Sequence, residues 1–217
     1  MLLSHARRFL FIHIYKTGGT SVRAALEPHA RLPKWSWWQA LDLRLPLCPT
    51  PPSLVLEPHA WASEVRAALD RDLYNAYFKF AFVRNPWDWQ VSLYHHALQT
   101  SGHHYHARIS AMESFEEFLL WHGRNSPWLQ KDFICDESGE LIVDFVGRFE
   151  TLAADFAAIC SRIGVRAELQ HMNKSQHGDY RAYYTPRTQR IVEEFWQEDL
   201  DFFGYSFDED RDSRLAA

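Results

Sequence analysis

The sequence predicts a single α/β domain, 1–217, in which helices flank a mainly parallel central sheet to give three layers. Two buried-strand patterns, 9–14 and 77–83, are each followed by a polar turn and then by a helical pattern. A third apolar run, 141–146, also precedes a helical pattern. This alternation is typical of parallel sheets, because two parallel strands can be joined only through a crossover, usually a helix.

The first helix is expected to begin at a cap, Thr20 or Ser21, and to bury Val22 and Leu26. From 28 to 58 the helical periodicity is lost, and we interpret this stretch as an irregular insertion within the domain. Its tryptophans either cover the core or stack on a ligand, and the sequence leaves both roles open. These tryptophans are Trp35, Trp37 and Trp38.

A short helix around 60–69 is expected to lead into the second strand. After that strand, Asn85 is a suitable N-cap residue and Pro86 suits the first helical position. The following helix is therefore expected to begin at 86. One of its faces is apolar, since large side chains recur there at helical spacing. They are Trp87, Val91, Tyr94 and Leu98.

Two helices are predicted around the third apolar run. A capping box of Ser114 and Glu117 opens the first of them, and we expect Gly123 to end it. The second follows the run and is expected to end at Gly164. Its apolar positions again share one face: Leu152, Phe156, Ile159 and Ile163.

The last predicted helix begins at Thr185 and Pro186 and runs to about Phe203, just before Gly204. The charged tail, 208–217, is expected to be frayed. We find no internal repeat and no interdomain linker, which agrees with one domain.

The net charge of −5 argues against a general attraction to nucleic acid or to anionic membranes. The three cysteines, Cys48, Cys135 and Cys160, have no metal-ligand spacing, so we expect reduced thiols and no metal site. The apolar run near the start is too short to span a bilayer and leads into a glycine turn rather than a cleavage site. The sequence therefore predicts an unexported, cytoplasmic protein without a membrane span.

A lysine, two glycines and two hydroxyl residues lie between the first strand and its helix. In an open α/β sheet, ligands bind beyond the carboxyl ends of the strands, and a helix that begins there offers free N–H groups to an anion. The lysine adds a full positive charge, so the loop suits a phosphate. A tight turn with a solvated lysine is the alternative. The loop residues are Lys16, Thr17, Gly18, Gly19, Thr20 and Ser21.

A Walker A loop would bind phosphate at the same place in a P-loop kinase. Here the order is different, because Lys16 precedes Gly18 and Gly19 instead of following the glycines. Lys16 would leave from the end of the strand, whereas a Walker lysine leaves from the start of the helix. An NTP-dependent kinase is therefore the second choice.

Arg84 follows the second strand directly, and Ser92 lies eight residues later on the next helix. The planar fork of arginine matches phosphate oxygens, and a serine hydroxyl can complete such a site. A helix cap with a surface ion pair is the alternative for this motif alone. Two anion sites at two strand ends suit a nucleotide that carries phosphates at both ends of its ribose.

The stretches IYKTGGTS and YFKFAFVRNPWDWQVSLY closely resemble the carbohydrate sulfotransferases, including the heparan sulfate 2-O-sulfotransferase relatives and the bacterial sulfotransferase family 2 relatives. The similarity continues through VDFVGRFETLAADF, HMNKSQHGDYRAYYTPRT and DLDFFGYSF. The resemblance implies a P-loop-like fold. It also implies transfer of a sulfuryl group from 3′-phosphoadenosine 5′-phosphosulfate (PAPS) to a hydroxyl of a carbohydrate or related acceptor.

The same resemblance implies the roles of individual residues. The loop from Lys16 to Ser21 would bind the 5′-phosphosulfate, and Arg84 and Ser92 would hold the 3′-phosphate. A third segment would close over the cofactor, with its lysine as the most direct contact. This segment consists of Asn173, Lys174 and Ser175.

Two departures from the family pattern lie near these motifs. Tyr15 stands where relatives usually carry proline, which alters the entry to the loop but removes no phosphate donor. Trp89 and Gln90 replace an Arg-Leu pair, which deletes one positive charge near the 3′-phosphate site. We expect weaker cofactor binding from the second departure, but not its loss.

Sulfuryl transfer resembles phosphoryl transfer, in which charge develops on the leaving group while both partners are held in line. Lys16 is the expected partner of the leaving oxygen, so that no metal is required. A base must take the proton of the acceptor hydroxyl. His59 is our first choice for this base and Glu57 its competitor, because the family carries its catalytic histidine at this place.

Other histidines are interpreted differently. His13 lies inside the first strand and is expected to be a satisfied core residue. A histidine-rich stretch between His95 and His106 has few carboxylates, so we expect it to line the acceptor side rather than to bind metal. A catalytically silent nucleotide- or glycan-binding module remains the third alternative, in which replacing His59 would change nothing.

Overall fold

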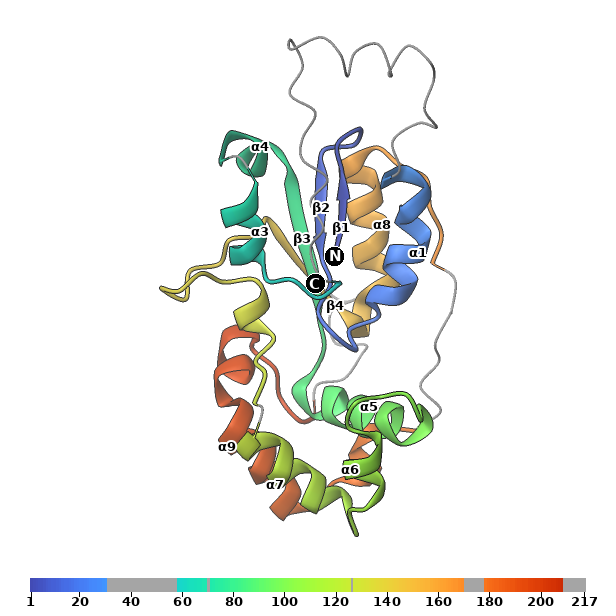
Figure 1. Cartoon of the computed structure of the whole chain (residues 1–217), viewed down its shortest axis with the longest axis vertical. Helices are drawn as coiled ribbons and strands as arrows, with labels where there is room; N and C mark the ends of the chain where they lie inside the picture. Colours follow the sequence, from blue (N-terminus) through green and yellow to red (C-terminus); the bar gives the residue numbers. More distant parts are fainter. Residues whose placement is uncertain (31–57, 70, 126, 170–177, 209–217) are drawn as a thin grey trace.

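The computed structural model describes residues 1–30, 58–69, 71–125, 127–169 and 178–208. Within them the predicted α/β class is confirmed, because helices flank a four-stranded, mostly parallel sheet (Figure 1). In spatial order the strands are β1 (Leu2–Ser4), β2 (Phe9–Ile12), β3 (Phe78–Val83) and β4 (Phe145–Arg148).

The parallel pairs β2–β3 and β3–β4 form the centre and one edge of the sheet. The antiparallel strand β1, which the sequence did not predict, forms the other edge. The third predicted strand, 141–146, is wrong in position, since pairing with β3 begins only at Phe145 and Leu141 makes no more than an isolated bridge to Cys135. A continuous apolar run has no alternation from which its paired part could be located.

Both faces of the sheet are covered. Alternate residues of β2 and β3 point to opposite sides, so that Phe11 and Phe80 enter one apolar cluster and Leu10 and Ala81 the other. The first cluster contains side chains of α1 (Gly19–Ala30) and α8 (Leu152–Ile163), and the second contains side chains of α3 (Ala62–Ala68) and α4 (Arg71–Ala76). Figure 1 shows these two pairs of helices on opposite sides of the strands.

The remaining helices gather beyond the carboxyl ends of β2 and β3, in the lower half of Figure 1. They are α5 (Pro86–Gln99), α6 (His106–Ser110), α7 (Phe115–Asn125) and α9 (Pro186–Phe203), with the short 3-10 turns η1 (Lys131–Phe133), η2 (Phe149–Thr151) and η3 (Tyr180–Tyr183). The predicted cap of α5 is confirmed, because the Asn85 side chain accepts a hydrogen bond from the N–H of Trp87 at 3.1 Å. No helix in the described ranges is both long and apolar enough to cross a membrane.

Three helix boundaries differ from expectation. Helix α1 begins at Gly19, so that Thr20 and Ser21 lie in its first turn and do not cap it, and it continues through Pro28 to Ala30. Helix α7 does not end at Gly123. A Cβ atom there would lie 2.4 Å from the ring of Phe195, so the glycine allows α7 to pack closely against α9. The predicted ends of α8 and α9 are confirmed, since Gly164 and Gly204 adopt the left-handed conformation.

Candidate functional site

The loop after β2 is held in an unusual backbone conformation. Lys16 adopts a φ of 62°, in the left-handed region, and Gly18 follows with a φ of 81°. The buried Thr17 hydroxyl donates to the carbonyl of Ile14 at 2.9 Å and so fixes the turn. The N–H of Ser21 then donates to the Gly18 carbonyl at 3.1 Å, which begins α1. A non-glycine residue in this conformation persists only where its surroundings fix it, and such residues concentrate at functional sites.

Both glycines of the loop are required by packing. A Cβ atom on Gly18 would lie 2.9 Å from Leu152 and 3.2 Å from Phe149, and one on Gly19 would lie 1.9 Å from the ring of His13. The Cβ positions of both residues are therefore directed at neighbouring side chains of the protein. Because neither glycine has a Cβ atom, the loop can lie close to His13, just after β2, and to Phe149 of η2.

Replacing Gly19 with alanine is expected to lower the free energy of unfolding by about 1–3 kcal/mol, because the new methyl group would overlap the His13 ring. Displacement of His13 should also move His59, whose ring centroid lies 4.5 Å away. Chemical denaturation measures the effect. Gly102→Ala is the matched control, since a Cβ atom there meets no atom within 4 Å. Equal stabilities of the two variants would contradict this packing.

The structure brings the two predicted phosphate motifs into direct contact. The Arg84 guanidinium Nη1 donates to the backbone carbonyl of Lys16 at 3.3 Å, across the carboxyl ends of β2 and β3. Burial, and then the nearby charge of Arg84, lower the pKa of Lys16 to about 8. Asp88 offsets the charge of Arg84, whereas Lys16 forms no ion pair among the described residues, so a net positive charge lies beyond the carboxyl ends of these strands in a protein that is acidic overall. An anion is the natural ligand for such a place.

Arg84 itself is held rigidly. Its Nε donates to the carboxylate of Asp88 at 2.8 Å, and both side chains are buried. Its guanidinium carbon lies 4.0 Å from the centre of the Phe149 ring. Among the described residues, Nη2 has no hydrogen-bond partner and remains as a donor. Ser92 is buried on α5, and within the same residues it makes no hydrogen bond to Arg84.

The backbone of Arg84 is fixed by two residues that no sequence motif identifies. The Gln130 side chain accepts from the Arg84 N–H and donates to the Arg84 carbonyl, both at 2.8 Å. The buried carboxylate of Asp199 in turn accepts from the N–H groups of Gln130 and Lys131. These residues lie far from the motif in sequence, so only the tertiary structure reveals them.

His59 lies beside the entrance to the loop. Its Nδ1 is 2.7 Å from the carbonyl oxygen of His13. A carbonyl can only accept, so Nδ1 carries the hydrogen and Nε2 keeps a free lone pair. Burial lowers the pKa of His59, which favours the neutral form. A neutral imidazole with a free Nε2 has the form that a general base requires.

The expectation that His13 is a buried core residue is confirmed, but the expectation that its hydrogen bonds are satisfied is wrong. It is buried, and burial lowers its pKa to about 3. Its Nδ1, however, has no hydrogen-bond partner among the described residues, so it is not a satisfied core histidine. Its ring instead packs against Phe11 and His59, at centroid distances of 5.6 and 4.5 Å.

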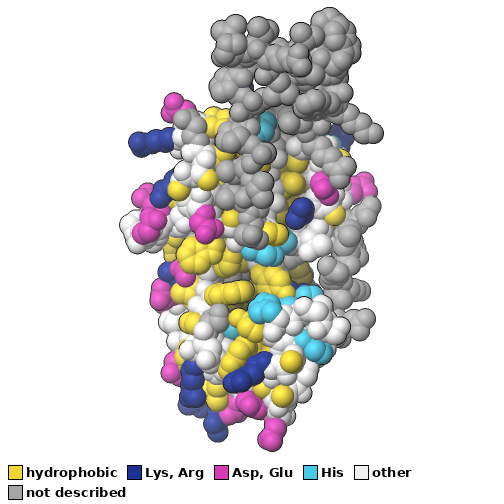
Figure 2. Space-filling view, viewed as in Figure 1, with side chains coloured by type: hydrophobic (Ala, Val, Ile, Leu, Met, Phe, Trp, Pro, Cys, Tyr) yellow, Lys and Arg dark blue, Asp and Glu magenta, His cyan; other side chains and the backbone are white. Residues whose placement is uncertain are grey.

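Part of the histidine-rich stretch reaches the same loop. The Tyr15 hydroxyl lies 3.0 Å from Nε2 of His103, and the Tyr15 ring also approaches His96 and His59. The charge of Lys16 contributes to lowering the pKa of His96 and that of His103, after burial in both cases. Figure 2 shows histidine side chains gathered over and just above α5. In the described ranges, no three His, Cys, Asp or Glu side chains are placed to hold a metal.

The two residues that depart from the family pattern on α5 have structural partners. The indole N–H of Trp89 donates to the Tyr15 carbonyl at 2.7 Å, so Trp89 supports the loop. Gln90 Oε1 lies 2.8 Å from Nδ1 of the buried His122. Several predicted residues lie outside the described ones, namely Glu57, Asn173, Lys174, Ser175, Trp35, Trp37 and Trp38.

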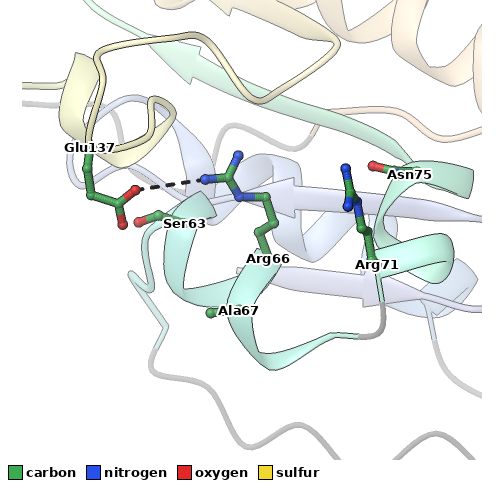
Figure 3. Close-up of a pocket in the computed structure, with 6 residues that line it drawn as sticks. All are labelled: Ser63, Arg66, Ala67, Arg71, Asn75 and Glu137. Carbon is green, nitrogen blue, oxygen red and sulfur yellow. Dashed lines mark ion pairs between the residues drawn. The ribbon is translucent and has the colours of Figure 1, made fainter.

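A pocket of 440 Å³ lies elsewhere, between α3 and α4 (Figure 3). It is lined by Ser63, Arg66, Ala67, Arg71, Asn75 and Glu137, none of which belongs to the loop or to the Arg84 motif. Arg66 is paired there with Asp136 and Glu137, at 3.2 and 3.9 Å, so its charge is largely offset. The pocket is thus separate from the two predicted phosphate motifs.

The structure is thus an α/β protein in which Lys16 and Arg84 lie together beyond the carboxyl ends of two parallel strands, where ligands of open α/β sheets bind. The chain belongs to the Sulfotransferase family, whose family model matches residues 1–206. No carbohydrate-specific subfamily is shown by this match.

Two individual proteins are also similar to this chain. An uncharacterized protein of Archaeoglobus fulgidus is 28% identical over 123 residues, which cover 56% of this chain and 96% of that protein. The crystal structure of mouse sulfotransferase SULT7A1 complexed with PAP has a TM-score of 0.54 and 15% identity, covering 92% of this chain and 86% of that one. At this identity the structural similarity supports the fold alone.

Proposed function

We propose that this protein transfers the sulfuryl group of PAPS to a hydroxyl of a carbohydrate or related acceptor. The observation that carries the proposal is the hydrogen bond between the Arg84 guanidinium and the Lys16 carbonyl, which unites the two phosphate motifs in one site. His59 stands beside that site, and its Nε2 has no hydrogen-bond partner among the described residues. Membership of the Sulfotransferase family supports the same sulfuryl donor, and the mouse sulfotransferase of similar fold was crystallised with PAP, the nucleotide that PAPS leaves after transfer.

The residues present fit a nucleotide with phosphates at two positions. The start of α1, a helix of 12 residues, would offer backbone N–H groups and its positive dipole end to the 5′-phosphosulfate, with Lys16 beside it. The free Nη2 of Arg84 would reach the 3′-phosphate, and Ser92 would complete that site. The hydroxyl of Thr17 already donates to the Ile14 carbonyl, so Thr17 would take part in this loop through its backbone N–H. The segment from Asn173 to Ser175 would close over the nucleotide, as the family resemblance implies.

When bound, PAPS supplies an activated sulfuryl group. The bond between sulfur and the bridging phosphate oxygen would break as a new bond forms between sulfur and the acceptor oxygen. Lys16 would stabilise the negative charge that develops on the phosphate. His59 Nε2 would take the proton of the acceptor hydroxyl, with Glu57 as the competing base. The net charge of −5 favours a neutral or weakly charged acceptor over a highly sulfated polymer.

The pH dependence of kcat/KM is expected to be bell-shaped. On the acid side the rate should fall as His59 becomes protonated, at a pKa below the usual value of histidine, because burial lowers it. On the alkaline side the rate should fall as Lys16 loses its proton, whose pKa burial and Arg84 lower to about 8. Initial rates measured across pH, with both PAPS and acceptor well below their KM values, report these groups in the free enzyme.

His59→Ala should remove the acid limb of that profile together with most of the activity. His5→Ala is the control, because its ring contacts Tyr77 rather than the loop. An unchanged acid limb in His59→Ala would exclude His59 as the base and leave Glu57.

Transfer itself is tested with radiolabelled PAPS and a panel of neutral saccharides, sulfated polysaccharides and phenols. The proposal predicts label on a saccharide. Label on phenols alone would contradict the carbohydrate part of the proposal but keep the sulfotransferase part. Cofactor binding without transfer to any acceptor would favour a silent binding module.

A further inference from the structure

Tyr15 stands where the family pattern has proline, and unlike proline it brings a hydroxyl group to the loop. Tyr15 directly precedes Lys16, and its carbonyl is fixed by the indole of Trp89 at 2.7 Å. Its hydroxyl lies 3.0 Å from Nε2 of His103, a residue from the connection between α5 and α6. The side chain thus joins the phosphate loop to the helices beyond the sheet.

The direction of that hydrogen bond follows from the second nitrogen of His103. The backbone N–H of Tyr105 donates to His103 Nδ1 at 3.2 Å, so Nδ1 is an acceptor and carries no hydrogen. Burial, and then nearby histidines and Lys16, lower the pKa of His103 to about 4, so the ring is neutral at neutral pH. The single ring hydrogen must then lie on Nε2, which donates to the Tyr15 oxygen.

The Tyr15 oxygen is therefore the acceptor of this hydrogen bond, and the hydrogen of the Tyr15 hydroxyl is not used in it. Within the described part of the chain this hydroxyl has no other hydrogen-bond partner. Burial raises the pKa of Tyr15 to about 12, so the hydroxyl keeps its hydrogen and remains a donor. A half-buried hydroxyl with an unused hydrogen, fixed by its neighbour, is a preorganised donor for a ligand.

The surroundings of Tyr15 indicate which part of the nucleotide it faces. The centre of its ring lies 5.3 Å from that of His59, on the side where the acceptor would lose its proton. Lys16 follows it in the chain, on the side where the leaving phosphate would lie, and its charge reaches His103. The sulfuryl group passes between these two sides, and its oxygens carry negative charge throughout the transfer.

We propose that Tyr15 is a further substrate-binding residue of this site, whose hydroxyl, oriented by His103, donates a hydrogen bond to a sulfuryl oxygen of PAPS. The inference rests on the proposed function and extends it, since Lys16 and the start of α1 are assigned to the 5′-phosphosulfate as a whole, but no residue has yet been assigned to its sulfuryl oxygens. His103 is a positioning residue in this arrangement, because it acts only through Tyr15.

The test compares two ligands that differ only in the sulfuryl group. Calorimetric titration of Tyr15→Phe is expected to show binding of PAPS about tenfold weaker than in the unmodified protein, with binding of 3′-phosphoadenosine 5′-phosphate (PAP) unchanged. Phenylalanine keeps the ring contacts with His59 and His96. Equal changes for PAPS and PAP would overturn the inference.

Tyr74→Phe is the matched control. Burial raises the pKa of Tyr74 to about 12 as well, and its hydroxyl donates to the carbonyl of Ile142 at 2.8 Å, outside the loop and the Arg84 motif. It should leave the ratio of PAPS to PAP affinity unchanged.

The positioning role of His103 has its own test. His103→Leu should reproduce the selective loss of PAPS affinity, whereas His103→Gln, which keeps an N–H donor, should restore most of it. Combining Tyr15→Phe with His103→Leu should cause no further loss of PAPS affinity. His103 acts only by orienting the Tyr15 hydroxyl, which Tyr15→Phe already removes. Additive losses would overturn the role assigned to His103.

The outcomes separate this inference from the proposed function. If the unmodified protein binds neither PAPS nor PAP, the proposed function fails and the inference fails with it. If it binds both and Tyr15→Phe behaves like the unmodified protein toward both, the inference alone is overturned.

Discussion

Replacing Lys16 with alanine is expected to lower kcat by about 10²- to 10³-fold, with a much smaller loss of affinity for PAP. The physical reason is that charge develops on the leaving phosphate mainly in the transition state, where the ammonium contributes most. The backbone N–H groups at the start of α1 remain available to bind the ground state. Single-turnover rates with radiolabelled PAPS, together with calorimetric titration with PAP, measure the two effects separately.

This prediction needs a control for changes in the backbone of the loop. Because Lys16 adopts a φ of 62°, a change at this position can also alter the turn. Lys16→Gly removes the charge but suits the left-handed conformation, and Lys16→Ala removes the charge without that benefit. Similar losses of kcat in both variants would assign the effect to the charge. An unchanged kcat in either variant would remove Lys16 from the chemical step.

The second large effect concerns the 3′-phosphate. Arg84→Ala is expected to weaken PAP binding by about 10- to 100-fold, because charge-assisted hydrogen bonds from a guanidinium to a phosphate are strong. Binding of AMP, which lacks the 3′-phosphate, should change little. The ratio of the two affinities, measured by calorimetric titration, is therefore the informative quantity. Equal losses for PAP and AMP would show that Arg84 does not bind that phosphate.

The buried partner of Arg84 must be controlled for. Removing the guanidinium leaves the Asp88 carboxylate buried without its ion pair, at a cost in stability of about 3–5 kcal/mol. Arg84→Gln combined with Asp88→Asn removes both charges together and avoids this penalty. The double variant should lose the preference for PAP over AMP as fully as Arg84→Ala, while its thermal unfolding stays closer to that of the unmodified protein.

Much of the fold could be predicted because local signals and tertiary structure agree. The cap at Asn85, the apolar face of α5 and the left-handed glycine ends of α8 and α9 all depend on neighbouring residues in the chain. The position of β4 could not be predicted, since a continuous apolar run contains no information about which part pairs with β3. The three-residue strand β1 is too short to leave a pattern.

The candidate site was predictable to the extent that it follows from strand ends. Arg84 comes directly after β3 and Lys16 lies four residues beyond the end of β2, and adjacent parallel strands place their carboxyl ends together. The residues that hold them could not be found in this way. Gln130 reaches the Arg84 backbone and His103 reaches Tyr15 only through tertiary folding, across 46 and 88 positions of the chain.

Calorimetric titration of the purified protein with PAP, ADP and ATP, each with and without Mg²⁺, tests the central claim most directly. A site that combines Lys16 at one phosphate with Arg84 at the other should prefer PAP, and should do so without the metal. Preference for ATP that depends on Mg²⁺ would contradict the sulfotransferase account and favour a P-loop kinase.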